Sequence, residues 1–358
     1  MSIDLVCTIG PSSSSTAVLK ELLLSGMNIA RLNMSHGNHD SHKQAIEAIR
    51  AASSETGKPV RIMGDLQGPK IRLGKLAGDE ARLKEGETFI LDRLEEPGGR
   101  ERAALDNPSV LEDIRSGAVI LINDGEVKLR VTESSPERIV TQVLVGGTIG
   151  SRKGVNLPGT KLRLTALTEK DKKDLQFLNG QEIDFIACSF VREASHLEEI
   201  RRFLDSMMNG RTPGIISKIE TVQAVLNFRS IREASDGIMI ARGDLGVELP
   251  FEQIPFIQKA LLRECSRSGT YVITATHMLQ SMIEHPVPTR AEVTDVFQAV
   301  LDGTRAVMLS AESSVGKYPV QSTKVLGTVA SFAEKAGKEG ESDFTLEALY
   351  GYPPFDAL

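Results

Sequence analysis

The sequence predicts an α/β protein, a (β/α)8 TIM barrel into which a small β-barrel domain is inserted. Three observations support this fold class. Short β-branched apolar runs alternate with segments of helical spacing along most of the 358 residues, which is typical of βα units and a parallel sheet. Between residues 69 and 158, short alternating runs replace that rhythm. Several apolar runs also end in polar or charged side chains, as barrel strands do where they carry a site.

Eight apolar runs are the predicted barrel strands. In chain order they are Leu5–Gly10, Met27–Ser35, Pro59–Asp65, Phe185–Phe190, Gly214–Glu220, Asp236–Ala241, Tyr271–Thr276 and Ala306–Ser310. Segments with helical spacing lie between them. Residues 12–16 offer N-caps for the first helix, which Gly26 ends, and a second helix is predicted over residues 38–55. Ser195 is predicted to cap a helix that ends near Met208.

A separate β domain is predicted over residues 69–158, between two βα units. Its strands are Thr88–Leu91, Val119–Ile122, Val127–Val131 and Arg138–Val145. Asp124-Gly125, between the second and third of these, is a strong hairpin signal. The barrel domain then comprises residues 1–68 and 159–338, with Gly68-Pro69 and Leu157-Pro-Gly159 as hinges, and residues 339–358 form an apolar tail.

Composition excludes several classes of function. The net charge of −6 and the absence of tryptophan argue against nucleic-acid binding. No secretory signal and no membrane-spanning run is seen, so a cytoplasmic protein is expected. Three cysteines without CxxC spacing are expected to be buried thiols: Cys7, Cys188 and Cys265. The histidines form no zinc motif. Four of them are expected to face solvent: His39, His42, His196 and His285.

The fifth and sixth runs, with the helical segment between them, form a predicted βαβ unit. Strands of such a unit are parallel, so their ends emerge on the same side. Lys218, Glu220 and Asp244 lie at these ends and are expected to converge. A cation between two carboxylates suggests a site that handles an anion beside a hard metal ion.

These polar residues belong to longer motifs that resemble those of the pyruvate kinases. The motifs occur in that family's order from about residue 3 to 335: Cys7–Pro11, Ala30–Gly37, Asp65–Arg72, Ser151–Pro158, Ser217–Glu220, Ala241–Glu248, Ala275-Thr276 and Pro288–Asp295. The resemblance implies a barrel with a mobile lid that transfers a phosphoryl group from phosphoenolpyruvate to ADP, giving pyruvate and ATP in glycolysis. It also implies dependence on Mg²⁺ or Mn²⁺, no nucleic-acid or membrane partner, and a homo-oligomer.

The resemblance assigns a role to each polar strand end. Glu220 and Asp244 correspond to the divalent-metal ligands, Lys218 to the lysine that stabilises the phosphoryl and enolate oxygens, and Arg31 to the arginine that grips the phosphate. The substrate carboxylate is held by backbone amides of Gly243 and Asp244 and by the Thr276 hydroxyl. The implied catalytic residues are Lys218, Arg31, Thr276 and Ser310, the last two as parts of the network that protonates enolpyruvate. The implied nucleotide-binding residues are Pro11, Asn33, His36, Arg72 and Lys153.

One departure from the family concerns its monovalent-cation site. The corresponding positions are Asn33, Ser35, Asp65 and the carbonyl of Leu66. The potassium-dependent members have glutamate where this chain has Lys70, and a lysine ammonium can replace the charge of the cation. K⁺ is therefore expected not to be required; the alternative is that Lys70 points to solvent.

Further departures concern the nucleotide edge and the end of the chain. Val315 stands where the family has a nucleotide-contacting lysine, and His277 stands where glutamine is common. The sequence ends at Leu358, so no C-terminal α/β domain and no activation by sugar phosphates through its site are expected. The tail is expected to pack on the barrel or on a second subunit, and a dimer is expected rather than the family's usual tetramer.

Two other functions remain open. One is an enolate-stabilising lyase of the phosphoenolpyruvate/pyruvate barrel superfamily, and the other is a catalytically silent metabolite sensor. The inserted lid, with Arg72 and Lys153 on the nucleotide side, favours the kinase over the lyase. The retained charges at the strand ends argue against a sensor.

Overall fold

Eight parallel strands form a closed barrel in the computed structural model, which describes residues 3–207 and 212–339. The strands are β1 (Asp4–Thr8), β2 (Met27–Asn33), β3 (Arg61–Asp65), β12 (Phe185–Cys188), β13 (Gly214–Ile219), β14 (Gly237–Ala241), β15 (Tyr271–Ala275) and β16 (Ala306–Leu309). Their order around the barrel is β1-β16-β15-β14-β13-β12-β3-β2. The predicted fold class is confirmed. Six of these strands end one or two residues before the predicted end, and β3 and β14 end at the predicted residue.

The barrel strands are buried on both faces, as parallel strands usually are. All five residues of β14 are buried, and so are the last five of β13. The three cysteines are buried as predicted. The expectation that His196 faces solvent is wrong: it is 7% exposed, on the same face of its helix as the buried Leu197 and Ile200, and its Nδ1 accepts a hydrogen bond from the Arg192 N–H.

Helices connect the strands. They are α1 (Thr16–Leu24), α2 (His39–Thr56), α3 (Glu169–Asn179), α4 (Ala194–Met207), α5 (Val222–Leu226), α6 (Phe228–Ala234), α7 (Arg242–Glu248), α8 (Ile254–Ser268), α9 (Arg290–Leu301), α10 (Ala311–Ser314) and α11 (Pro319–Glu339), with short 3-10 turns η1 (Pro108–Glu112), η2 (Phe251–Gln253) and η3 (Gln280–Ile283). Ser15 caps α1 as expected. The prediction for Ser195 is wrong, because α4 already begins at Ala194 and the Ser195 hydroxyl donates to Glu193.

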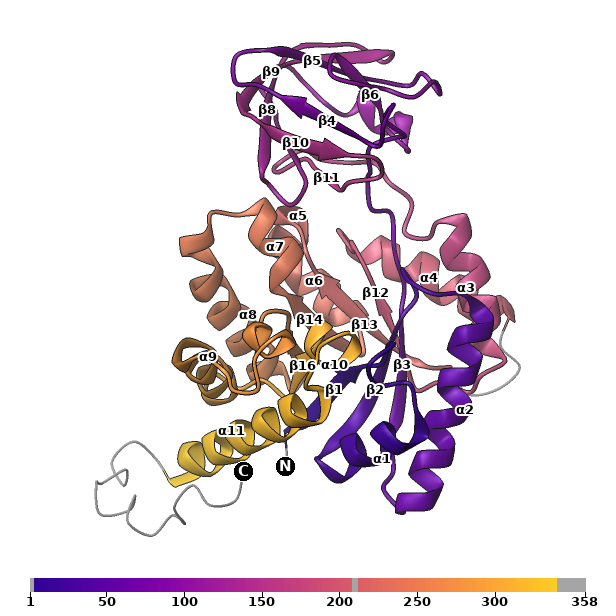
Figure 1. The fold of residues 1–358 in the computed structure, drawn as a ribbon, viewed down its shortest axis with the longest axis vertical. Helices are drawn as coiled ribbons and strands as arrows, with labels where there is room; N and C mark the ends of the chain where they lie inside the picture. The colour runs from indigo at the N-terminus through magenta and orange to yellow at the C-terminus, as the bar shows by residue number, and fades with distance from the viewer. Residues whose placement is uncertain (1–2, 208–211, 340–358) are drawn as a thin grey trace. The chain divides into compact units, whose positions relative to one another are not determined.

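The inserted segment forms a β domain of its own (Figure 1). Its strands are β4 (Glu80–Leu83), β5 (Thr88–Asp92), β6 (Arg102–Ala104), β7 (Val119–Ile122), β8 (Val127–Ser134), β9 (Arg138–Val145), β10 (Gly147–Gly150) and β11 (Val155–Asn156). Six of them form one sheet in the order β11-β7-β8-β9-β5-β6, and β10 pairs with β4. The predicted hairpin is confirmed: β7 and β8 are antiparallel, and Asn123 and Asp124 take the positive φ that such a turn requires.

The chain divides into two compact units, Met1–Gly64 with Lys259–Leu358, and Asp65–Gln258. The inserted β domain and β12–β14 belong to the second unit, whereas β1, β2, β15 and β16 belong to the first. No helix within residues 3–207 and 212–339 is long and apolar enough to cross a membrane. The predicted apolar tail lies outside the described residues, apart from its first residue.

Candidate functional site

Lys218, on β13, is buried among carboxylates. Its Nζ lies 2.9 Å from Glu220 Oε1 and 3.2 Å from Asp65 Oδ1, and it donates a hydrogen bond of 2.6 Å to Ser189 Oγ. Lys218 and Glu220 are two residues apart, so the period of an extended chain places them on one face. The Lys218 side chain is 10% exposed and those of both acids are 1% exposed. An ammonium group at this depth needs such partners to remain charged.

Glu220 is the acid with the most perturbed environment in this cluster. Burial raises its pKa, Lys218 opposes that rise, and the negative charge of Asp244 adds to it. Its Oε2 accepts a 2.7 Å hydrogen bond from the Phe190 N–H, and Phe190 has the left-handed φ of 56° that non-glycine residues rarely adopt. A further positive charge at Glu220 would therefore be favourable.

Asp244 lies in the first turn of α7 and forms an ion pair with Lys70. Lys70 Nζ is 3.0 Å from Asp244 Oδ1 and 5.7 Å from the centre of the Phe190 ring. The Lys70 side chain is only 21% exposed. The alternative that Lys70 points to solvent is therefore not what the structure shows, and the lysine pairs with a carboxylate expected to bind metal.

The acids of this cluster can bind Mg²⁺ through two carboxylates. Among the residues that the structure describes, no group of three or more His, Cys, Asp or Glu side chains is arranged to hold a metal. Mg²⁺ is usually bound through only one or two carboxylates, with substrate oxygens and water completing the shell. Glu220 and Asp244, which interact electrostatically, can provide two such hard oxygen ligands.

The residues expected at the monovalent-cation site lie in both units. In the second unit, the Leu66 carbonyl accepts a 2.8 Å hydrogen bond from Ser189 Oγ, and the same hydroxyl lies 3.4 Å from Asp65. In the first unit, Asn33 Oδ1 accepts a hydrogen bond from the Ser35 N–H. The structure thus joins Asp65 and Leu66 through Ser189, and separately joins Asn33 to Ser35.

Arg31 is the central charged group in the first unit. It extends from β2, is 8% exposed, and its Nη1 donates a 2.8 Å hydrogen bond to Thr8 Oγ1. The Thr8 hydroxyl donates in turn to the Leu309 carbonyl at the end of β16. Thr8 therefore fixes the guanidinium at the carboxyl ends of these strands.

Thr276 and Ser310 both have features typical of functional positions. Thr276 and the following His277 have positive φ values of 68° and 56°, a strain that clusters at active sites. The Ser310 hydroxyl is buried and has no hydrogen-bond partner among the described residues. Glu312, fully buried behind it, accepts hydrogen bonds from the N–H groups of Ser310 and Leu279 and so holds this loop.

The predicted nucleotide residues fall into two groups. Pro11, Asn33 and His36 line a 620 Å³ cavity in the first unit, together with Val315, which is 57% exposed. Lys317 does not line it and instead pairs with Glu284.

The other nucleotide group lies on the inserted domain. Arg72 pairs through its backbone with Gly154, and its Nη1 donates to the Arg152 carbonyl, so it lies close in the fold to Lys153. Lys153 itself is exposed.

Four site residues were missed by the sequence reasoning: Thr8, Ser189, Phe190 and Glu312. Ser189 had a usable signal, because it ends an apolar run as Asp65 and Thr276 do. The backbone strain of Phe190 has no signal in the sequence.

Comparisons with known proteins agree with this geometry. The family model described as pyruvate kinase, barrel domain, matches residues 1–323. The pyruvate kinase of Geobacillus stearothermophilus is 46% identical over 334 residues, which are 93% of this chain and 57% of that protein. That of Clostridium perfringens is 44% identical over 331 residues, which are 92% of this chain and 70% of that protein. A crystal structure of a pyruvate kinase from Cryptosporidium parvum superposes with a TM-score of 0.91 at 38% identity, covering 100% of this chain and 73% of that one.

The chain thus spans a little over half the length of the first of these relatives. The family model nevertheless covers nearly all of the described residues, including both groups of strand-end side chains. On this evidence, the chain belongs to the pyruvate kinase family.

Proposed function

We propose that this protein is a pyruvate kinase that transfers a phosphoryl group from phosphoenolpyruvate to ADP. The observation that carries the proposal is Lys218, buried in contact with two carboxylates and a serine hydroxyl, where one of the two, Glu220, also interacts electrostatically with Asp244. Phosphoryl transfer requires positioning and charge stabilisation more than covalent catalysis. A preorganised buried cation beside metal-binding acids meets that requirement.

In this reaction Lys218 stabilises the negative charge on the transferred phosphoryl group and on the enolate oxygen that is left. Arg31, held by Thr8, binds the phosphate. Glu220 and Asp244 would hold Mg²⁺, whose charge would neutralise phosphoryl oxygens. The backbone of Gly243 and Asp244 binds the substrate carboxylate together with the Thr276 hydroxyl.

The second half of the reaction adds a proton to carbon 3 of enolpyruvate. The Ser310 hydroxyl is buried without a hydrogen-bond partner in residues 3–207 and 212–339, and this supports a role in that proton transfer, since the hydroxyl can bond to water or substrate. The strained backbone at Thr276 supports its role in the same network.

K⁺ is not required in this proposal. Lys70 supplies a fixed positive charge next to Asp244 that a monovalent cation would otherwise supply. Rates measured in buffer free of Na⁺ and K⁺ test this point; a large loss of rate that K⁺ restores would contradict it.

Residues 69–158 act as a lid over a barrel domain formed by residues 1–68 and 159–338. The lid carries Arg72 and Lys153 toward the nucleotide and excludes water when it closes, which strengthens electrostatic interactions and prevents hydrolysis. Asn156 on β11 donates a hydrogen bond to Glu248 on α7, which joins the lid to the helix that follows β14.

A homodimer is the assembly we propose. Phe251 and Phe256, which are 85% and 77% exposed, are candidates for its interface. The expectation that sugar phosphates do not activate the protein stays a prediction, tested by adding fructose 1,6-bisphosphate to the assay.

A coupled assay with phosphoenolpyruvate, ADP and Mg²⁺ tests the proposal. Equal amounts of pyruvate and ATP are expected. Pyruvate without ATP would indicate a different reaction on the same substrate, and absence of both products would indicate a binding protein. The exposed Lys172→Met variant, which removes only a surface ion pair with Glu169, is the matched control for substitutions of buried lysines.

A further inference from the structure

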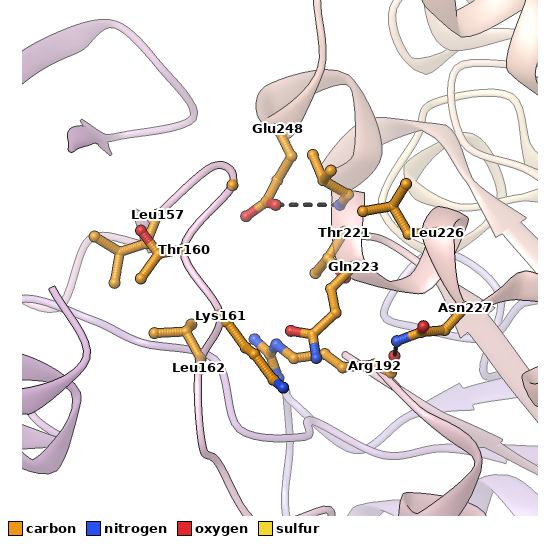
Figure 2. A pocket seen from close by; sticks show the side chains of 12 residues that line it. Leu157, Thr160, Lys161, Leu162, Arg192, Thr221, Gln223, Leu226, Asn227 and Glu248 are labelled. Carbon is orange, nitrogen blue, oxygen red and sulfur yellow. Dashed lines mark hydrogen bonds between the residues drawn. The ribbon is translucent and has the colours of Figure 1, made fainter. Parts of the chain in front are cut away.

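A second pocket lies beside the hinge at the end of the lid and takes no part in the proposed reaction. It encloses 270 Å³, enough for a small molecule, within the Asp65–Gln258 unit. One wall is residues 157–162, which follow the lid. The other wall comes from loops and helices that follow β12, β13 and β14: Arg192, Thr221, Gln223, Asn227 and Glu248 are among its residues (Figure 2).

Arg192 is the most unusual group in this pocket. It is 5% exposed, and burial lowers the pKa of its guanidinium. Its side chain donates one hydrogen bond, from Nη1 to the Phe190 carbonyl, and lies 5.9 Å from the Phe190 ring. Within residues 3–207 and 212–339 it has no ion pair with any acid. Glu248 and Glu220 oppose the lowering of its pKa from a distance, but neither forms an ion pair with it in the described residues. A buried guanidinium that no carboxylate contacts favours an anionic ligand.

Two further residues, Lys161 and Gln223, add hydrogen-bonding groups to the pocket. Both line the same pocket as Arg192, and Figure 2 shows their side chains directed into it. Gln223 Oε1 is buried without a hydrogen-bond partner in the described structure. The terminal torsion of glutamine is soft, so this oxygen can turn toward a donor on a ligand.

Glu248 limits what can bind. Figure 2 shows it away from Lys161, across the pocket, where it accepts hydrogen bonds from Asn156 and the Val222 N–H. The pocket therefore has a cationic end and, across from it, an acidic side chain that already accepts two hydrogen bonds. An anion is expected to bind at the cationic end, away from Glu248.

We propose that this pocket binds a small oxyanion that also carries a hydroxyl group, as a 2-hydroxycarboxylate or a hydrogen phosphate group does. The oxyanion lies between Arg192 and Lys161, and the hydroxyl donates to Gln223 Oε1. This site is separate from the one that holds phosphoenolpyruvate, and its ligand is an effector rather than a substrate.

Two chains of contacts connect the pocket to other parts of the unit. Arg163, next to the pocket wall, donates from its backbone N–H and Nε to Asp113 at the C-cap of η1 in the lid. On the other side, Arg192 bonds to the Phe190 carbonyl, and the Phe190 N–H bonds to Glu220. Occupancy is therefore expected to alter the Mg²⁺ dependence of activity, a consequence that rests on the proposed function.

Calorimetric titration of the full chain in Mg²⁺ buffer at constant ionic strength tests the site itself. The probes are glycolate, its hydroxyl-free counterpart acetate, and inorganic phosphate. Saturable binding of glycolate or phosphate is expected, and which one binds more tightly identifies the oxyanion. Lys161→Gln and Arg192→Gln should each weaken it at least tenfold. Gln223→Leu should remove the preference for glycolate over acetate, and Lys172→Gln should change nothing.

The titration measures binding and not turnover, so its result is independent of the activity assay that tests the proposed function. Lys161 is exposed and is not part of the strand-end site, so its variant is expected to fold and to keep basal activity even if Arg192→Gln does not fold. Glycolate or phosphate bound at the strand-end site would persist in all three pocket variants. Binding that is unchanged in Lys161→Gln and Gln223→Leu, or no saturable binding of glycolate or phosphate, would overturn the proposal.

Discussion

Replacing Lys70 with methionine separates two effects of its positive charge: competition with a divalent cation for Asp244, and replacement of the charge of K⁺. Lys70 Nζ and Asp244 Oδ1 are 3.0 Å apart, and the two side chains are 21% and 29% exposed. At an effective dielectric constant of about 20, unit charges at this separation attract by roughly 5 kcal/mol. Desolvation of the two groups and screening by solvent reduce the net free energy of this ion pair to about 2 kcal/mol, which is about thirtyfold in an equilibrium or rate constant.

The two roles predict changes of opposite sign. Lys70 competes with a divalent cation for Asp244, so Lys70→Met should lower the Mg²⁺ concentration needed for half-maximal rate by up to about thirtyfold. The same substitution removes positive charge from the site, so kcat without K⁺ should fall about tenfold or more, and K⁺ should restore much of it.

Steady-state rates at varied Mg²⁺, in tetramethylammonium buffer with and without K⁺, measure both quantities. Lys70→Arg should behave nearly as the wild type. Lys20→Met is a control, because the Lys20–Glu55 ion pair is also short, at 2.8 Å, but is more exposed to solvent than the Lys70–Asp244 pair. An unchanged kcat for Lys70→Met in K⁺-free buffer, or a wild-type protein that itself needs K⁺, would show that the Lys70 ammonium does not take the place of K⁺.

Three further predictions concern single residues. Burial raises the pKa of Glu220 above its usual value, so its contribution to stability is present at low pH and is lost as pH rises through the raised pKa. The Tm of the metal-free protein should therefore fall relative to that of Glu220→Gln as pH increases. A difference in Tm that does not change with pH would contradict this. Val315→Lys should lower the KM for ADP by roughly two- to fivefold, from one exposed charge pair worth up to about 1 kcal/mol, without changing that for phosphoenolpyruvate; an unaltered KM for ADP would argue against a nucleotide at this cavity. Ser310→Ala should reduce kcat about tenfold or more by removing a proton-transfer group. The urea midpoint should stay within error, since this hydroxyl has no hydrogen-bond partner in the part of the chain that the structure describes; a destabilised variant with normal kcat would indicate a structural role.

The barrel could be predicted from the sequence because its strands are buried on both faces and read as continuous apolar runs. β13 and β14 are such runs, and both appear in the structure close to their expected bounds. Parts of the lid could not be predicted. β4, β6, β10 and β11 are two to four residues long, and their pairing partners are distant in the chain, as β10 with β4 shows.

The site was predictable where its residues share one strand. Lys218 and Glu220 are two residues apart on one face of an extended segment, so their proximity follows from local geometry. The ion pair between Lys70 and Asp244 joins residues 174 positions apart and depends on tertiary structure. The left-handed backbone of Phe190 and the burial of Arg192 are also properties of the fold, with no local pattern that reveals them.

The rate of ATP formation by Lys218→Met, compared with the wild type and with Lys172→Met, shows whether the buried Lys218 ammonium supports phosphoryl transfer. The buried ammonium is the group assigned to stabilise the transferring phosphoryl and the enolate. The wild type and Lys172→Met should form pyruvate and ATP equally. Lys218→Met, with its fold confirmed by circular dichroism, should lose at least about a thousandfold in kcat, or roughly 4 kcal/mol. A folded Lys218→Met protein that retains kcat within threefold of the wild type would contradict the account.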